Sequence, residues 1–156
     1  GYSLFTCLLR PHSKGSVKLS KEGEEFKLLI DHNFLSDSRD EKNIIEAVKR
    51  AREVLLSKEF DEVRGNEMAP GNMVNTDEEI LQYIRKTALT VYHPVGTCKM
   101  GIDDLAVVSP KDLKVKGMNN LRVIDASIMP TIVSGNTSAP TMMIAEMGAR
   151  MILNKV

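Results

Sequence analysis

Short apolar segments alternate with turn residues through the first third of the chain, and this pattern restricts what that region can fold into. We predict strands at residues 2–9, 16–20 and 25–32, which are rich in Phe, Leu, Val and Ile. The segments between them, RPHSKG and KEGE, contain the Gly, Pro and polar residues that are typical of turns. The first third is therefore predicted to form β structure.

A helical pattern replaces the strand pattern from residue 38. The helix predicted over 38–60 has an apolar face formed by Ile44, Val48, Ala51 and Leu55. Ser38 and Glu41 fit the capping box, in which a hydroxyl and a carboxylate three residues apart close the first helical turn. A loop rich in Gly, Pro and Asn is predicted to follow at residues 62–75.

A second helix is expected after this loop, and the last third of the chain differs again. Thr76 and Glu79 fit another capping box, and the apolar face consists of Ile80, Ile84 and Ala88. Two further strands are predicted at 113–117 and 120–127. The final helix should have Pro140 in its first turn and an apolar, methionine-rich face of Met143, Met147 and Met151, which we expect to be core.

The composition excludes several classes of protein. The 156 residues suffice for one ordinary domain, and 42% apolar with 27% charged residues is typical of a folded chain. The 21 basic and 21 acidic residues balance, so nothing favours a nucleic-acid partner. No apolar run reaches the roughly 20 residues needed to cross a bilayer. The chain does not begin with Met, which we interpret as an internal cut in a longer protein.

The segment TVYHPVGTCKMG, residues 90–101, contains the most reactive side chains. His93 and Cys98 are five residues apart, with no further ligand cluster, so a metal site is disfavoured. A Cys–His nucleophile usually takes its two members from separate elements, and Cys98 is predicted to be buried and inert. The glycine spacing does not match a phosphate-binding loop.

A second segment, SGNTSAP, suggests a partner for His93. It places Asn136 just before a helix N-terminus, where free backbone N–H groups favour negative charge. A histidine that takes a proton and an asparagine that holds the resulting oxyanion would form a catalytic pair. Two structural alternatives remain: Asn136 caps the helix and His93 ends a strand, or an exposed Asn136-Thr137-Ser138 sequence accepts a glycan.

These segments resemble the glucose–methanol–choline (GMC) flavin oxidoreductases. The matching stretches are HPVGTCKMG, NNLRVIDASIMPTIVSGNTSAPTMMIAE and, more loosely, LLRPHSKGSVKLS. The sequences YHPVGTCKMG and SIMPTIVSGNTSAPT are most similar to the insect glucose-dehydrogenase-like branch of this family. That resemblance favours a secreted protein.

The resemblance implies an α+β fold that is the C-terminal part of a two-domain enzyme. Residues 1–101 would belong to a substrate-binding domain with an antiparallel sheet and helices, ending in the His93 segment. Residues 102–156 would return to the FAD-binding domain and add a strand and a terminal helix. The G-x-G-x-x-G dinucleotide fingerprint is absent, so the N-terminal half of the same protein would have to supply it.

The resemblance also implies a reaction. FAD would accept hydride from a CH–OH group of an alcohol or sugar, with His93 as base and Asn136 as its partner. Tyr92, His93, Asp125, Ala126, Asn136 and Thr137 would contact the cofactor. Oxygen or a quinone would reoxidise the flavin. The isolated fragment is expected to be inactive, and the alternative is a non-enzymatic remnant or interaction module without flavin.

Overall fold

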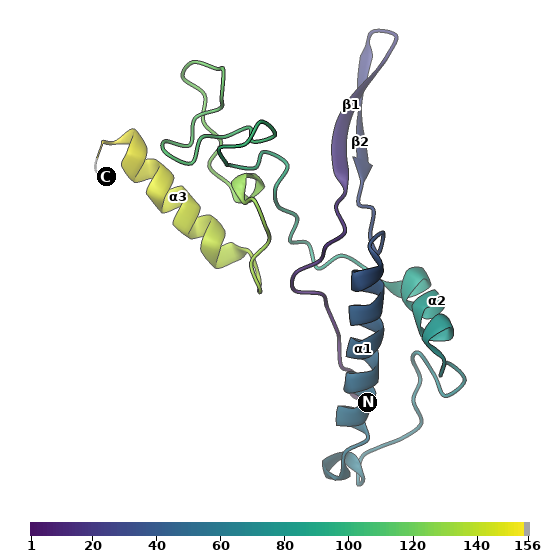
Figure 1. Ribbon diagram of the computed structural model, residues 1–156. Coiled ribbons are helices and arrows are strands. Elements are labelled where there is room, and N and C mark those ends of the chain that lie inside the picture. The colour runs from purple at the N-terminus through teal and green to yellow at the C-terminus, as the bar shows by residue number, and fades with distance from the viewer. Residues whose placement is uncertain (155–156) are drawn as a thin grey trace. The chain divides into compact units, whose positions relative to one another are not determined.

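The computed structural model describes residues 1–154, and the chain divides into two units between Thr90 and Val91 (Figure 1). We call residues 1–90 the N-terminal unit and the remainder the C-terminal unit. A two-stranded antiparallel sheet and several helices confirm the α+β class. The predicted division at residues 101 and 102 concerns the domains of a complete enzyme and remains a prediction.

The N-terminal unit begins with a β-hairpin. Strands β1 (Ser16–Glu22) and β2 (Glu25–Asp31) pair antiparallel, with Val17 opposite Ile30, which confirms two of the predicted strands. Gly23 forms the turn with a φ of 64°, a conformation that favours glycine. Every residue of β2 is exposed, although Phe26, Leu28 and Ile30 are apolar. A hairpin alone is marginally stable in water, so its apolar side chains need a covering surface.

The strand predicted at residues 2–9 is wrong, because the structure has no strand before Ser16. An extended segment becomes a strand only when a neighbour pairs with its backbone, and β1 and β2 pair only with each other. The segment instead uses its side chains. Leu8 packs against the helical core of the unit, and the ring of Tyr2 lies 4.9 Å from that of Phe60.

Helices α1 (Ser38–Leu55) and α2 (Asp77–Thr87) pack together around the buried residues Ile44, Ile80 and Ile84. The Thr76–Glu79 capping box is confirmed, since each side chain accepts a backbone N–H of the other residue. Ala88, predicted in the apolar face, is the exposed C-cap of α2. The first predicted helix ends at Leu55, and the single turn η1 (Lys58–Phe60) is separate from it.

The Ser38–Glu41 capping box is wrong, because Asp37 caps α1 by accepting the N–H of Arg39 at 2.9 Å. An aspartate one residue earlier is an equally good cap and competes for the same position. The Arg39 guanidinium and backbone N–H, both hydrogen-bonded to this carboxylate, hold the pKa of Asp37 far below its usual range. Glu41 instead forms an ion pair with Arg85 of α2.

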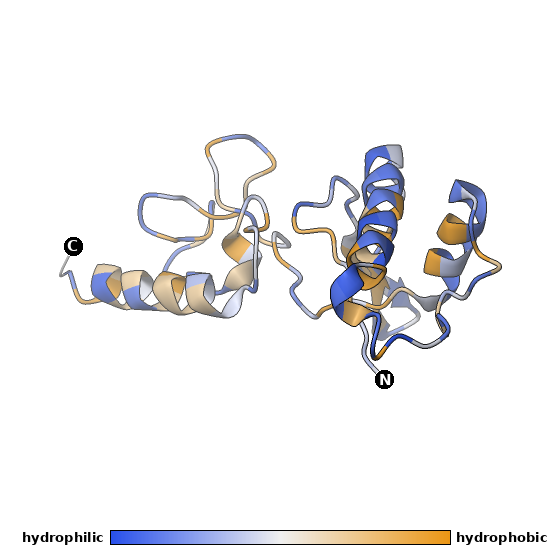
Figure 2. Ribbon diagram, turned by 90° about the horizontal axis from the view of Figure 1, so that it is seen from below, coloured by the Kyte–Doolittle hydropathy of each residue, from blue (hydrophilic) through white to orange (hydrophobic). Residues whose placement is uncertain are grey.

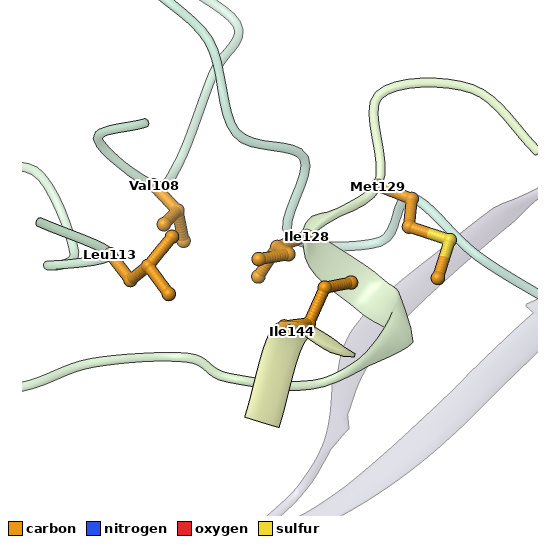
Figure 3. Packing of buried hydrophobic residues seen from close by; sticks show 5 residues of the cluster. All are labelled: Val108, Leu113, Ile128, Met129 and Ile144. Carbon is orange, nitrogen blue, oxygen red and sulfur yellow. The ribbon is translucent and has the colours of Figure 1, made fainter. Parts of the chain in front are cut away.

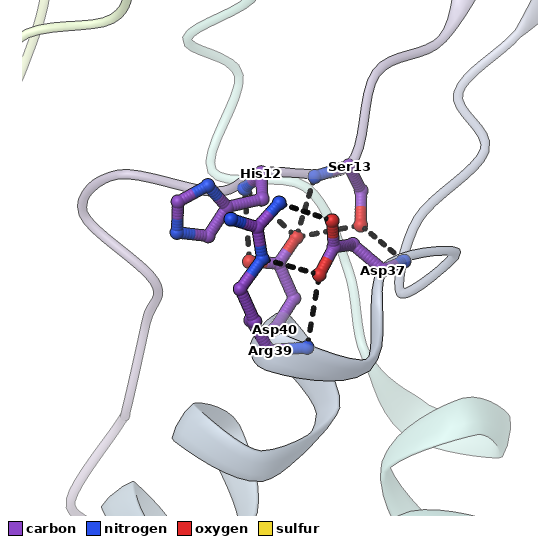
Figure 4. A network of polar contacts seen from close by, with 5 residues as sticks. All are labelled: His12, Ser13, Asp37, Arg39 and Asp40. Carbon is purple, nitrogen blue, oxygen red and sulfur yellow. Dashed lines mark hydrogen bonds and ion pairs between the residues drawn. The ribbon is translucent and has the colours of Figure 1, made fainter.

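Asp40, in the first turn of α1, forms hydrogen bonds with the segment that leads into the hairpin (Figure 4). Its buried carboxylate accepts the N–H groups of His12 and Ser13 and the Ser13 hydroxyl, and the Ser13 hydroxyl in turn accepts the N–H of Asp37. Burial disfavours the charged carboxylate, but the hydrogen bonds together outweigh it and lower the pKa of Asp40.

The C-terminal unit contains the turn η2 (Ala126–Ile128) and helix α3 (Ser138–Ile152). Among its described residues there is no strand, only the isolated bridges Met100–Val108, Val108–Val115 and Lys114–Arg122. The strands predicted at 113–117 and 120–127 are therefore wrong. Leu113 and Asn120 each have a φ of 56°, which interrupts the extended backbone that a strand requires.

Val108, Leu113, Ile128, Met129 and Ile144 form the core of this unit (Figure 3). Gly148 of α3 is buried, and a Cβ atom there would lie 2.4 Å from Ile124 Cγ2, so the helix approaches this segment closely. The predicted methionine-rich face is core only in part, because Met151 packs against the core whereas Met143 is 56% exposed. Figure 2 shows that α3 is more apolar than α1.

Candidate functional site

His93 lies in an irregular segment with an unusual backbone. Tyr92, directly before it, has a φ of 63°, a value that is rare for a bulky residue and often found at functional sites. Pro94, directly after it, restricts the backbone of His93 to extended conformations. Gly96 has a φ of 88°, a conformation that favours glycine and allows a tight turn. Three neighbouring residues thus constrain the position of the His93 backbone.

The segment after His93 is tied to η2. The N–H of Cys98 donates to Ser127 O at 3.0 Å, and the N–H of Met100 donates to Ile128 O at 2.7 Å. Cys98 is partly buried and packs against the core of the unit, in line with a packing role. A Cβ atom on Gly96 would lie 3.2 Å from Met129 O, so the turn passes close to this backbone.

The side chain of His93 reaches the start of α3. Its Nδ1 atom forms a hydrogen bond of 2.9 Å with Oγ1 of Thr137. The other ring nitrogen, Nε2, takes no part in this bond. His93 is half-buried and Thr137 is buried. Since Asn136 directly precedes Thr137, the bond brings His93 to the segment that carries Asn136.

Asn136 does not cap the helix, so that structural alternative is wrong. The N-cap of α3 is Thr137, and no side chain makes a cap hydrogen bond there. The Asn136 side chain is exposed in this chain, which leaves it accessible to a ligand or to modification. The other alternative, a strand-end position for His93, is also wrong because no strand adjoins it.

The N-terminus of α3 retains its positive electrostatic character. Its first turn contains no acidic residue, and Pro140 has no N–H group to satisfy. The backbone N–H groups of Ser138 and Ala139 have no acceptor within the helix. This end of α3 therefore favours a negatively charged or electron-rich group.

Asp125 and Ala126 belong to η2 and not to the predicted strand. Asp125 is its N-cap, and its Oδ1 accepts the N–H of Ser127 at 2.8 Å. Asp125 is exposed and Ala126 is half-buried. Ser127 O also accepts from Cys98, so η2 and the His93 segment are joined by backbone hydrogen bonds. The predicted site residues thus come from three short segments of one unit.

Other kinds of site find little support in the described part of the chain. No group of three or more His, Cys, Asp or Glu side chains in residues 1–154 could hold a metal ion. No helix described here has the length and apolarity to cross a bilayer. A surface depression of about 450 Å³ adjoins α1, but its lining is mostly charged and includes none of the predicted site residues.

Two features of the site were not predicted. Thr137 was expected beside a cofactor because of its position, but its hydroxyl contact with His93 has no signal in the sequence. The positive φ of Tyr92 was also missed. The only available hint was the following His-Pro pair, which restricts the backbone of His93 but says nothing about Tyr92.

Comparison with known proteins identifies relatives for nearly the whole chain. The family model described as GMC oxidoreductase matches residues 11–145. An alcohol dehydrogenase [acceptor] of Pseudomonas putida is 46% identical over 156 residues, and an oxygen-dependent choline dehydrogenase of Staphylococcus epidermidis is 44% identical over 154 residues. The chain covers 28% and 27% of these two relatives, respectively, and is itself covered to 100% and 97%.

Solved structures show the same fold. The pyridoxine 4-oxidase from Mesorbium loti has a TM-score of 0.85 and 36% identity, over 94% of this chain and 28% of that one. A fungal aryl-alcohol oxidase has a TM-score of 0.83 and 32% identity, over 95% of this chain and 24% of the other. The fold and the sequence therefore agree on the family.

Proposed function

The chain belongs to the GMC oxidoreductase family, and from this premise we propose that it is the C-terminal part of an FAD-dependent enzyme that oxidises an alcohol CH–OH group. The relatives named above include dehydrogenases and oxidases of alcohols, and they are far longer than this chain. Apolar side chains are exposed on the hairpin and on α3, among them Phe26, Leu28 and Met142. Their exposure supports the proposal that a further part of the protein covers them.

The residues around α3 fit one side of a flavin. The uncapped, acid-free N-terminus of the helix suits the electron-rich pyrimidine edge of such a ring. Tyr92, Asn136 and the backbone of Thr137 would lie beside this ring, whereas Asp125 and Ala126 would contact the phosphate-ribityl arm of the cofactor. When bound, FAD would supply the hydride acceptor. The adenosine end would be bound by the N-terminal half of the enzyme, where the dinucleotide fingerprint is expected.

His93 and Asn136 act on the substrate hydroxyl. As the C–H bond of the alcohol breaks with loss of hydride, the O–H proton passes to Nε2 of His93, so that an aldehyde or ketone forms. The Asn136 amide donates a hydrogen bond to the oxygen while negative charge develops on it. The hydrogen bond between His93 Nδ1 and Thr137 Oγ1 carries this proposal, because it brings the base to the segment of its partner.

The substrate class is an alcohol, a choline-like alcohol or a sugar. The YHPVGTCKMG and SIMPTIVSGNTSAPT segments support the insect glucose-dehydrogenase-like branch within the family, which would favour a sugar. The named relatives are instead bacterial alcohol and choline dehydrogenases. Oxygen or a quinone would serve as the electron acceptor.

The test uses the full-length enzyme that contains this chain. We expect the purified protein to show flavin absorbance bands, which bleach when one class of alcohol is added without oxygen. Panels of simple alcohols, choline and sugars would then identify the substrate class, and the branch assignment fails if no sugar bleaches the flavin. A colourless protein that cannot be reconstituted with FAD would contradict the proposal and favour a non-enzymatic interaction module.

A further inference from the structure

We propose that Thr137 is a positioning residue for His93, in that its hydroxyl accepts the Nδ1–H of the ring and thereby presents the unprotonated Nε2 to the substrate. This inference rests on the proposed function, which makes His93 the base. It assigns to the Thr137 side chain a task that differs from contact with the cofactor.

The geometry of the contact between His93 and Thr137 supports this role. Nδ1 and Oγ1 are 2.9 Å apart, which is a normal hydrogen-bond length, and Thr137 is only 8% exposed. In a neutral imidazole one nitrogen carries the proton and the other accepts. If Nε2 is to accept a proton from the substrate, Nδ1 must carry the ring proton and donate it to Thr137. One hydrogen bond therefore fixes both the ring orientation and the tautomer.

Another N-cap threonine in the same chain behaves differently from Thr137. Thr76 has a ψ of 157°, the extended conformation usual for an N-cap, and its hydroxyl accepts the N–H of Glu79. Thr137 has a ψ of −4° and makes no side-chain cap hydrogen bond. The same residue type at the same helical position thus gives up its usual role, and its hydroxyl lies against His93 instead.

The backbone of Thr137 is itself held in place. Its carbonyl oxygen accepts the N–H of Thr141 at 3.0 Å and the Thr141 hydroxyl at 2.6 Å. Two hydrogen bonds to one carbonyl fix the backbone of Thr137 to the first turn of α3. The His93 ring, bonded to Thr137, is thereby held at a fixed position relative to α3.

The test compares four forms of the full-length enzyme: wild type, Thr137→Val, Thr137→Ser and Thr87→Val. Thr137→Val keeps the shape and removes the hydroxyl, whereas Thr137→Ser keeps the hydroxyl. Thr87→Val is the matched control, since it removes a threonine hydroxyl that donates to the Tyr83 carbonyl within α2 and has no part in holding Thr137 or His93. Ring ¹⁵N NMR with labelled histidine reports the tautomer, and the His93 signals are assigned by their absence in His93→Gln.

We expect the neutral His93 ring of the wild type to be protonated at Nδ1, and Thr137→Val to shift the ring towards the other tautomer. We expect Thr137→Val to lower kcat by roughly tenfold to a hundredfold with FAD content unchanged, by analogy with partners that orient metal-binding histidines. Thr137→Ser should retain the wild-type tautomer and most of the activity, and Thr87→Val should leave the ring signals in place.

Several results would overturn the proposal. A wild-type ring protonated at Nε2 would do so without any variant, and so would unchanged ring signals and kcat in Thr137→Val. Equal damage by Thr137→Ser and Thr137→Val would show that the hydroxyl is not the relevant group. A wild-type enzyme that binds FAD but oxidises no alcohol would instead contradict the proposed function, while the ring spectrum would still decide whether Thr137 sets the tautomer.

Discussion

The N-termini of α1 and α3 differ in how their free backbone N–H groups are treated: side chains cap those of α1, whereas no side chain caps those of α3. At α1, Asp37 caps the helix and the Asp40 carboxylate in the first turn is saturated with hydrogen bonds from residues 12–13. At α3, the cap residue Thr137 turns its hydroxyl to His93, and the first turn has no acidic side chain. The N-terminus of α1 therefore serves stability, whereas that of α3 remains available for function.

The largest effect should come from the base beside α3. We expect His93→Ala to lower turnover of the full-length enzyme by roughly two to four orders of magnitude, because the proton acceptor is lost, while FAD remains bound. Steady-state assays with absorbance-based FAD quantification would measure this. His32→Ala is the matched control, since His32 is exposed and only stacks on Phe34. Near-wild-type turnover in His93→Ala would remove the role assigned to His93.

Asn136 at the same helix end should matter less. We expect Asn136→Ala to reduce kcat on the order of a hundredfold, the effect of losing one hydrogen bond to a developing oxyanion. Asn136→Asp keeps the size of the side chain but adds negative charge, and it should be at least as damaging. Rates for both variants with the best alcohol substrate would measure this. If the two variants behave like the wild type, Asn136 has no part in the reaction.

At α1 the expected effect is on stability. Asp40→Ala should destabilise the attachment of residues 12–13 by about 1.5 to 3 kcal/mol, because their backbone N–H groups lose hydrogen bonds to a charged acceptor. Hydrogen exchange of the His12 and Ser13 amides would measure it. The pKa of Asp40 is lowered by folding, so its contribution is present above the unfolded value and is lost as pH falls through the folded value, below about pH 4.

Asp40→Asn is the control for this pH dependence. It retains an oxygen acceptor of similar size but cannot titrate. The protection of these two amides, relative to unstructured amides at the same pH, should therefore fall in acid for the wild type and vary less with pH in Asp40→Asn. Equal acid sensitivity in both proteins would mean that another group controls the attachment.

The smallest expected effect comes from adding an acidic residue to the first turn of α3, where α1 has Asp40. Ser138→Asp should stabilise α3 by about 0.3 to 1 kcal/mol through the helix dipole, and it should weaken retention of FAD by repelling its electron-rich edge. Thermal unfolding of the FAD-free protein and titration with FAD would measure both. Ser138→Asn is the neutral control. Tighter FAD binding in Ser138→Asp would contradict the idea that this helix end is kept free of acids for the cofactor.

Local patterns predicted the helices well. The Thr76–Glu79 capping box, the buried face of Ile80 and Ile84, and the start of α3 at Ser138 all depend on contacts within a few residues. The failures depend on distant partners. Residues 2–9 have strand-like composition but no neighbour to pair with, and the segment at 113–117 begins with the positive φ of Leu113. Asp37 displaced Ser38 as a cap because both are good N-cap residues.

The candidate site shows the same division between local and distant information. Its residues His93 and Asn136 were identified from short motifs and from the family resemblance. The hydrogen bond that joins their segments was not, because Nδ1 and Oγ1 belong to residues 44 positions apart and meet only after the chain between them has folded. No spacing rule within a motif reports such a contact.

The separation of His93 and Thr137 also determines when the site can exist. Their hydrogen bond closes a loop that includes the core residues Val108, Leu113 and Ile128. Closing a long loop has an entropic cost that one hydrogen bond does not offset, so the core must form first. The geometry of His93 is thus a late product of folding, and a single backbone cut between residues 94 and 136 would raise the entropic cost of placing the ring even with every site residue still present.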